Sequence, residues 1–194
     1  MNLDYEIFSK INGLAGHFPY LDLFMVTVSK WGALLYGIAL VGLWLKKARP
    51  EQMMKNRKGV LKVILTAAIA LGINQIIGLA YFRPRPFATN NVTLLLDRST
   101  DPSFPSDHAA GATAVTASIF GENKAWGTIL TVMSLVLFFS RIYCGTHYPL
   151  DILGGMLTGL TGSYIANKLW PYLDGIAGKL VMIWNLLVDK STGV

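Results

Sequence analysis

Long apolar segments alternate with short polar ones along this chain. A helix that crosses a bilayer needs roughly 20 predominantly apolar residues. Four segments meet or approach that length, and a fifth is shorter and rich in Ala and Gly: residues 21–45, 59–79, 125–140, 150–169 and, as the shorter one, 107–121. Small residues favour a helix packed among other helices rather than one facing lipid. The pattern therefore predicts an all-α membrane helix bundle of about five spans, in a single domain over residues 1–194.

Two flanking segments carry their apolar residues on one helical face. The first has Ile7, Phe8, Ile11 and Leu14, and the second has Leu173, Ile176, Ala177, Leu180, Val181, Trp184, Leu187 and Val188. Such amphipathic segments are typical of helices that lie in the membrane interface. The second is long enough for a sixth span, but Asp174, Lys179 and Asn185 within it argue against one.

Composition and charge agree with a membrane protein and give its orientation. Hydrophobic residues make up 53% of the chain and charged residues 14%, which suits a membrane protein better than a soluble domain. The net charge of +6 lies largely in the segment KKARPEQMMKNRK, residues 46–58, so we expect lipid headgroups rather than nucleic acid as its partner. Short basic loops stay on the cytoplasmic side. This orientation places the N-terminus outside the plasma membrane and the C-terminus inside.

The polar residues best suited to chemistry then fall at the external ends of the spans. They come from three separate parts of the chain: Arg83, Arg85, Ser106, Asp107, His108, Arg141, His147 and Asp151. Polar groups that converge from different elements above an apolar bundle favour a binding or catalytic site.

Each of these residues alone also fits an ordinary structural role. Arginine side chains reach toward headgroups, Ser106 and Asp107 fit a helix cap, and Asp151 fits the acidic first turn of a helix. The lone Cys144 fits a packing residue. The three histidines lack the spacing of a zinc motif, so we expect neither a metal nor another cofactor.

As a group, these residues favour a phosphate site. A helix that begins at Asp107 offers free N–H groups to an anion, and arginine binds phosphate oxygens through two parallel hydrogen bonds. Asp151, four residues after His147, is placed to bind one imidazole nitrogen and leave the other free to attack phosphorus. His108 on the opposite wall is then suited to protonate the leaving oxygen.

Three sequence blocks carry a family resemblance. Residues 140–151, SRIYCGTHYPLD, read Ser-Arg, five residues, His, three residues and Asp, and they follow PSDH at 105–108 and RP at 85–86. In this order the blocks resemble the signatures of the type 2 phosphatidic acid phosphatase family, whose members dephosphorylate lipid phosphates without a metal. The resemblance covers about residues 75–160.

The chain departs from that family pattern at two positions. Gly78 stands where the first signature has a lysine, and Asp107 stands where the second has a glycine. Arg83 is therefore expected to supply part of the missing charge. With the context YFRPRPF at 81–87, these departures make the chain similar to the bacitracin-resistance type of undecaprenyl-diphosphatase. That subfamily removes one phosphate from the carrier lipid of wall synthesis at the outer face of the cell membrane.

The resemblance implies a two-step mechanism. His147 attacks the terminal phosphorus and forms a phosphohistidine, Asp151 holds the ring, and His108 protonates the departing lipid phosphate and then activates water. The phosphate oxygens are expected to be held by Arg85, Arg141, Ser106 and helix N–H groups, with Arg83 and Asp107 as further members of the binding set.

Two alternatives of different kinds stay open. One is a phosphatase of the same family that acts on phosphatidylglycerophosphate or another lipid phosphate. The other is a lipid carrier or flippase that binds pyrophosphate lipids without chemistry, although transporters usually place polar sites near the membrane midplane. The sequence does not indicate an oligomeric state.

Overall fold

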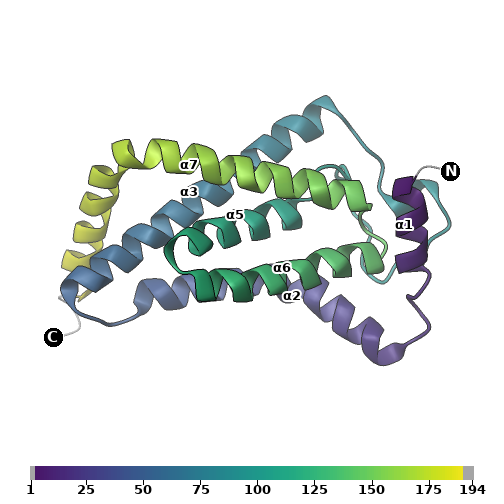
Figure 1. Cartoon of the computed structure of the whole chain (residues 1–194), viewed down its shortest axis with the longest axis horizontal. Coiled ribbons are helices and arrows are strands. Elements are labelled where there is room, and N and C mark those ends of the chain that lie inside the picture. The colour runs from purple at the N-terminus through teal and green to yellow at the C-terminus, as the bar shows by residue number, and fades with distance from the viewer. Residues whose placement is uncertain (1–2, 190–194) are drawn as a thin grey trace.

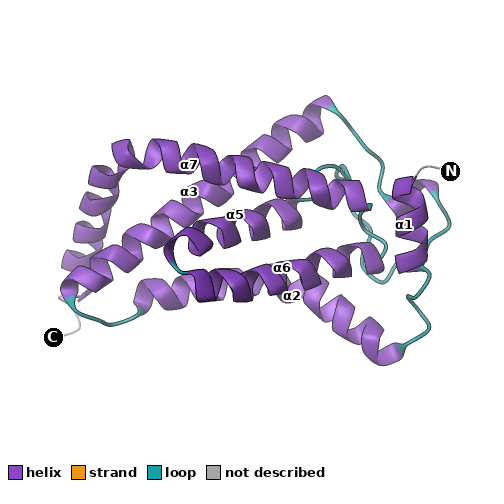
Figure 2. Cartoon of the chain, in the orientation of Figure 1, coloured by secondary structure: helices purple, strands orange, loops and turns teal. Residues whose placement is uncertain are grey.

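The computed structural model describes residues 3–189, and every regular element in that range is a helix (Figure 2). The elements in chain order are α1 (Leu3–Asn12), α2 (Pro19–Leu45), α3 (Pro50–Ala80), α4 (Pro86–Thr89), α5 (Asp107–Glu122), α6 (Lys124–Tyr143), α7 (Pro149–Trp184) and the π-helical turn η1 (Asn185–Asp189). Within the described residues, α2, α3 and α6 are long and apolar enough to cross a membrane. The all-α membrane bundle predicted from the sequence is confirmed.

The long helices alternate in direction, so that α1, the segment 81–106 and the turn 144–148 lie at the same end of the bundle (Figure 1). This end is the polar end of the bundle. The short α5 packs against α3, α6 and α7 in the centre, as its small residues predict. A Cβ added at Gly155 of α7 would lie 2.4 Å from the Ser106 carbonyl oxygen, and one at Gly159 would lie 2.7 Å from that of Ala110. Glycine therefore permits the close approach of α7 to α5.

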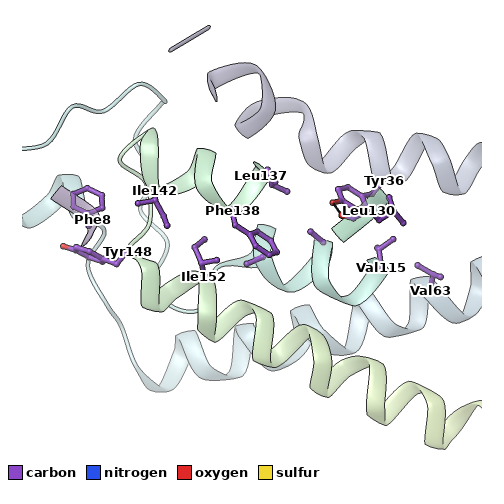
Figure 3. Packing of buried hydrophobic residues seen from close by; sticks show 12 residues of the cluster. Phe8, Tyr36, Val63, Val115, Leu130, Leu137, Phe138, Ile142, Tyr148 and Ile152 are labelled. Atoms are coloured by element: carbon purple, nitrogen blue, oxygen red, sulfur yellow. Dashed lines mark hydrogen bonds between the residues drawn. The ribbon is translucent and has the colours of Figure 1, made fainter. Parts of the chain in front are cut away.

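The buried apolar core runs along the bundle and reaches the polar end (Figure 3). Leu137 and Phe138 of α6 lie in its middle, and Phe8 of α1 meets the ring of Tyr148 edge-on at the polar end, with 5.3 Å between ring centroids. Through this contact, α1 packs against the start of α7.

The interfacial placement predicted for the N-terminal segment is only part of what α1 does. Its buried face consists of Asp4, Phe8 and Asn12, while Ile7 and Leu14 of the predicted apolar stripe are exposed. Asn12 donates hydrogen bonds of 2.8 Å to the carbonyls of Thr93 and Tyr143. Polar contacts of this kind fix α1 to the bundle, and no hydrophobic periodicity signals them.

The opposite end of the bundle corrects two expectations. The basic segment 46–58 is a loop only over residues 46–49, because Pro50 begins α3 as a favourable first helical residue. The C-terminal amphipathic segment is no separate helix: α7 continues through Pro171 and bends toward the start of α3 (Figure 1). An internal proline removes a helix hydrogen bond and favours such a bend. Lys58 pairs with Asp174 there, so the charge that argued against a span has a protein partner.

Candidate active site

A cavity of about 310 Å³ opens at the polar end of the bundle. It brings together five of the residues expected from the sequence: Arg85, Asp107, His108, Arg141 and His147. Its wall also contains Ser29 and Lys30 of α2 and, from the loop between α4 and α5, Asp97 and Asp101. The convergence of polar groups from separate parts of the chain thus exists in the fold.

His147 lies in the turn between α6 and α7 and is 2% exposed. Its Nδ1 lies 2.9 Å from the carbonyl oxygen of Ser103, and its Nε2 lies 3.3 Å from a guanidinium nitrogen of Arg85. A carbonyl oxygen accepts a hydrogen bond, so it favours the tautomer with the proton on Nδ1, in which the lone pair of Nε2 accepts a hydrogen bond from Arg85. Burial lowers the pKa of His147 to about 4, and the positive charges of Arg141 and Arg85 add to that effect. The imidazole is therefore neutral near pH 7.

The direct hydrogen bond expected between Asp151 and His147 is not formed. Asp151 Oδ2 lies 3.7 Å from His147 Nδ1, because this carboxylate oxygen accepts a 2.5 Å hydrogen bond from the Ser103 hydroxyl and a 2.7 Å bond from the Tyr148 backbone N–H. Asp151 thus holds His147 indirectly. It binds Ser103, whose carbonyl oxygen lies against His147 Nδ1, and it binds the backbone at the start of α7. The negative charge of Asp151 raises the pKa of His147, but by less than burial lowers it.

Arg83 is placed behind the cavity wall, not in it. Its guanidinium donates to Asp151 Oδ1 at 2.7 Å and to Asp4 Oδ2 at 2.6 Å, and it lies over the Tyr148 ring with 4.2 Å to the centroid. Burial lowers the pKa of Arg83, but the hydrogen bond to Asp4 and the negative charge of Asp151 raise this pKa by more, so that it lies above its usual value. Arg83 is thus paired with two carboxylates and does not line the cavity, and its contact with phosphate stays a prediction.

Arg85 and Arg141 are the arginines that line the cavity. Arg85 donates to the Thr146 carbonyl at 3.1 Å and to the Asp101 carboxylate at 2.9 Å. Arg141 donates to the Ser29 hydroxyl at 2.8 Å, while its buried Nε has no hydrogen-bond partner among the described residues. An unsatisfied buried donor costs free energy, so a ligand oxygen that accepts from Arg141 would remove that cost.

The start of α5 holds the remaining expected residues. Ser106 is fully buried and caps α5, since its hydroxyl accepts from the Ala109 N–H at 3.4 Å. The Asp107 carboxylate accepts from Asn74 at 2.8 Å and from Gln75 at 3.5 Å. Asp107 therefore ties α5 to α3, which accounts for an acid where the family pattern has glycine. These hydrogen bonds are structural, and the phosphate contacts expected of Ser106 and Asp107 stay predictions. His108 lies on the cavity wall that α5 provides.

Several residues of the site were not expected from the sequence. Ser103 and Asp4 act through contacts made across 48 and 79 residues of chain, to Asp151 and Arg83 respectively. No local pattern marks such contacts. Lys30 did leave a signal, because it is the lone charged residue between Asp22 and Lys46 in an apolar segment, and ionisable residues within membrane spans mark functional sites.

Known proteins are similar to this chain over most of its length. The undecaprenyl-diphosphatase BcrC of Bacillus subtilis is 34% identical over 190 residues, covering 98% of this chain and 96% of that protein. The crystal structure of Aquifex aeolicus LpxE superposes with a TM-score of 0.71 at 27% identity, covering 87% of this chain and 96% of that one.

A second solved structure shows the fold alone. The transmembrane PAP2 type phosphatidylglycerolphosphate phosphatase of Bacillus subtilis gives a TM-score of 0.62 at 20% identity, over 89% of each chain. The apolar helices α2, α3 and α6 make the chain a membrane protein. The sequence profile of the PAP2 superfamily matches residues 59–174, which include every residue named above for the cavity except Ser29 and Lys30. The chain therefore belongs to the PAP2 superfamily.

Proposed function

We propose that this protein hydrolyses undecaprenyl diphosphate to undecaprenyl phosphate and inorganic phosphate, at the outer face of the bacterial cell membrane. The observation that carries this proposal is the setting of His147. Its Nδ1 lies 2.9 Å from the Ser103 carbonyl oxygen, its Nε2 lies 3.3 Å from Arg85, and His147 lines the cavity. A neutral, fixed imidazole whose unprotonated nitrogen lies among cations suits in-line attack on phosphorus once a phosphate oxygen takes the hydrogen bond from Arg85.

The reaction proceeds in two steps. His147 Nε2 attacks the terminal phosphorus, the bond from that phosphorus to the bridging oxygen breaks, and the bridging oxygen leaves with the lipid phosphate. His108 takes part in its protonated form, which the negative charge of a bound diphosphate favours, and it donates its proton to that oxygen. Water then gives a proton to His108 and attacks the phosphohistidine, which releases phosphate and restores His147. Arg85 and Arg141 stabilise the charge on the transferring group, since phosphoryl transfer depends mainly on positioning and on fixed positive charge.

The substrate follows from the relatives and from the charge of the cavity. A relative similar over nearly the whole chain is named for undecaprenyl diphosphate, and Lys30, Arg85 and Arg141 line one cavity, which suits a group with more negative charge than a monophosphate. Removing the terminal phosphate would return the carrier lipid to wall synthesis and would protect cells from bacitracin. Phosphatidylglycerophosphate is the alternative substrate.

A substrate panel tests the activity. The purified protein in detergent is assayed for phosphate release from undecaprenyl diphosphate, undecaprenyl phosphate and phosphatidylglycerophosphate. We expect the highest kcat/KM for the diphosphate. Binding of the lipid without phosphate release would favour a carrier, and a higher kcat/KM for phosphatidylglycerophosphate would replace the proposed substrate.

Cysteine labelling tests the outer location. The exposed residues Thr100, in the loop before α5, and Gln52, at the start of α3, lie near opposite ends of the bundle. In a Cys144→Ser background, Thr100→Cys should react with an impermeant maleimide on intact cells, and Gln52→Cys only after the membrane is opened. Because Cys144 is fully buried, the original chain is a low-labelling control. The reverse pattern would place the site in the cytoplasm.

A further inference from the structure

Lys30 is a charged residue in an unusual place. It lies about three turns after the start of the apolar helix α2, and it lines the same cavity as His147. A lysine within a membrane span costs free energy, so one that faces a polar cavity is expected to have a partner there. The mechanism described above gives Lys30 no part.

The contacts of Lys30 leave its ammonium group available. Its Nζ lies 3.7 Å from Asp97 Oδ2, and the two side chains are 45% and 97% exposed. An ion pair between such exposed groups contributes little free energy. A phosphate oxygen in the cavity would therefore compete well with Asp97 for this ammonium.

The other cations around the His147 turn are more fully engaged. Asp4 and Asp151 occupy Arg83, whereas Arg85 lies next to the attacking nitrogen, 3.3 Å from His147 Nε2. Ser29 holds Arg141 at 2.8 Å and is adjacent to Lys30 in the chain. On the cavity wall formed by α2, the weakly paired Lys30 thus follows directly after Ser29, which binds Arg141.

We propose that Lys30 binds the second phosphate of a diphosphate, the one that leaves with the lipid. This inference rests on the proposed function. The ammonium neutralises negative charge that builds on the leaving phosphate as the bond to the terminal phosphorus breaks. A monophosphate has no group at this position, so Lys30 is a residue that sets the preference for diphosphates.

Two substrates with the same lipid chain test this role. The values of kcat/KM are measured for farnesyl diphosphate and farnesyl monophosphate with the wild type, Lys30→Met and Lys30→Arg. The expected loss in Lys30→Met is about 10- to 150-fold on the diphosphate, as for a lost hydrogen bond to a charged group, and less than about 3-fold on the monophosphate. Lys30→Arg should restore most of the diphosphate activity.

Matched controls separate this inference from the proposed function. Lys47→Met removes an exposed lysine from the loop at the opposite end of the bundle and should leave both kcat/KM values at wild-type levels. A wild type that cleaves no diphosphate would overturn the proposed function itself. An active wild type with equal losses on both substrates in Lys30→Met, or with no loss on the diphosphate, would overturn the role of Lys30 alone.

Discussion

The turn that carries His147 has two sides with different electrostatic character. On the buried side, Arg83 is held between Asp4 and Asp151, and Asp151 also accepts bonds from Ser103 and the Tyr148 N–H. On the cavity side, Lys30 pairs loosely with the exposed Asp97, and within the described chain the Nε of Arg141 has no partner. Matched charges fix a geometry, whereas donors with spare capacity bind a ligand. Arg83 on the buried side is therefore expected to hold the turn in place, and Arg141 on the cavity side is expected to bind a ligand.

The largest effect is expected on the buried side. Arg83→Ala leaves two buried carboxylates, Asp4 and Asp151, without their cation. Breaking a buried pair in this way costs about 3–5 kcal/mol of unfolding free energy, so the thermal unfolding midpoint in detergent should fall strongly. We also expect kcat to fall more than KM rises, because Arg83 positions the turn and does not touch substrate.

Lys62→Ala is the matched control for Arg83→Ala. Lys62 is about as exposed as Arg83, but its partner Glu122, 3.8 Å away, is 60% exposed, and loss of a pair with an exposed partner changes stability by less than about 1 kcal/mol. If Arg83→Ala instead raised KM with unchanged stability, Arg83 would bind phosphate and the contrast between the two sides would be wrong.

The second expected effect is a dependence of stability on pH. Burial lowers the pKa of His147 from 6.5 to about 4. Between pH 6.5 and 4 the unfolded chain therefore binds a proton that the folded chain does not. As the pH is lowered from 6.5 to 4, the free energy of unfolding falls by about 3 kcal/mol. Above pH 6.5 this contribution is constant. The thermal midpoint of His147→Gln should fall less steeply than that of the wild type between pH 6.5 and 4, and equal slopes would contradict the lowered pKa.

A smaller effect is expected on the cavity side. Arg141→Met should lower kcat/KM by about 10- to 150-fold, as for a charged hydrogen bond to the substrate, while the thermal midpoint stays close to that of the wild type. Ser29→Ala removes the hydroxyl that holds Arg141 but keeps the guanidinium that contacts the substrate, so kcat/KM should fall less, by about 2- to 12-fold. An Arg141→Met variant that loses stability rather than activity would move Arg141 to the structural group.

The smallest effect is expected from chelators. The proposed mechanism takes its positive charge from Lys30, Arg85 and Arg141, so EDTA should leave phosphate release unchanged. Activity that is lost with EDTA and restored by one divalent cation would show that a metal supplies part of that charge, with Asp97, Asp101 or Asp107 of the cavity wall as candidate ligands.

The sequence predicted the bundle and the cavity side better than the buried side. Apolar segments report lipid-facing helices directly, and blocks such as SRIYCGTHYPLD place His147 and Asp151 at the start of a helix. The pairing of Arg83 with Asp4 depends on how α1 folds back over 79 residues of chain. Arg83 and Arg85 are two residues apart and look alike in the sequence, and only the fold shows that Arg85 lines the cavity whereas Arg83 pairs with Asp4 and Asp151.

The central claim is that His147 is the nucleophile, and a trapped intermediate tests it most directly. The purified protein is mixed with a lipid diphosphate that carries radiolabel on its terminal phosphate, and the reaction is stopped within milliseconds in alkaline denaturant, where phosphohistidine is stable. The label should appear on the peptide that contains His147, should be lost in acid, and should be absent from His147→Ala, which should also release no phosphate above background. Phosphate release by a folded His147→Ala variant, or label on a different residue, would contradict the account.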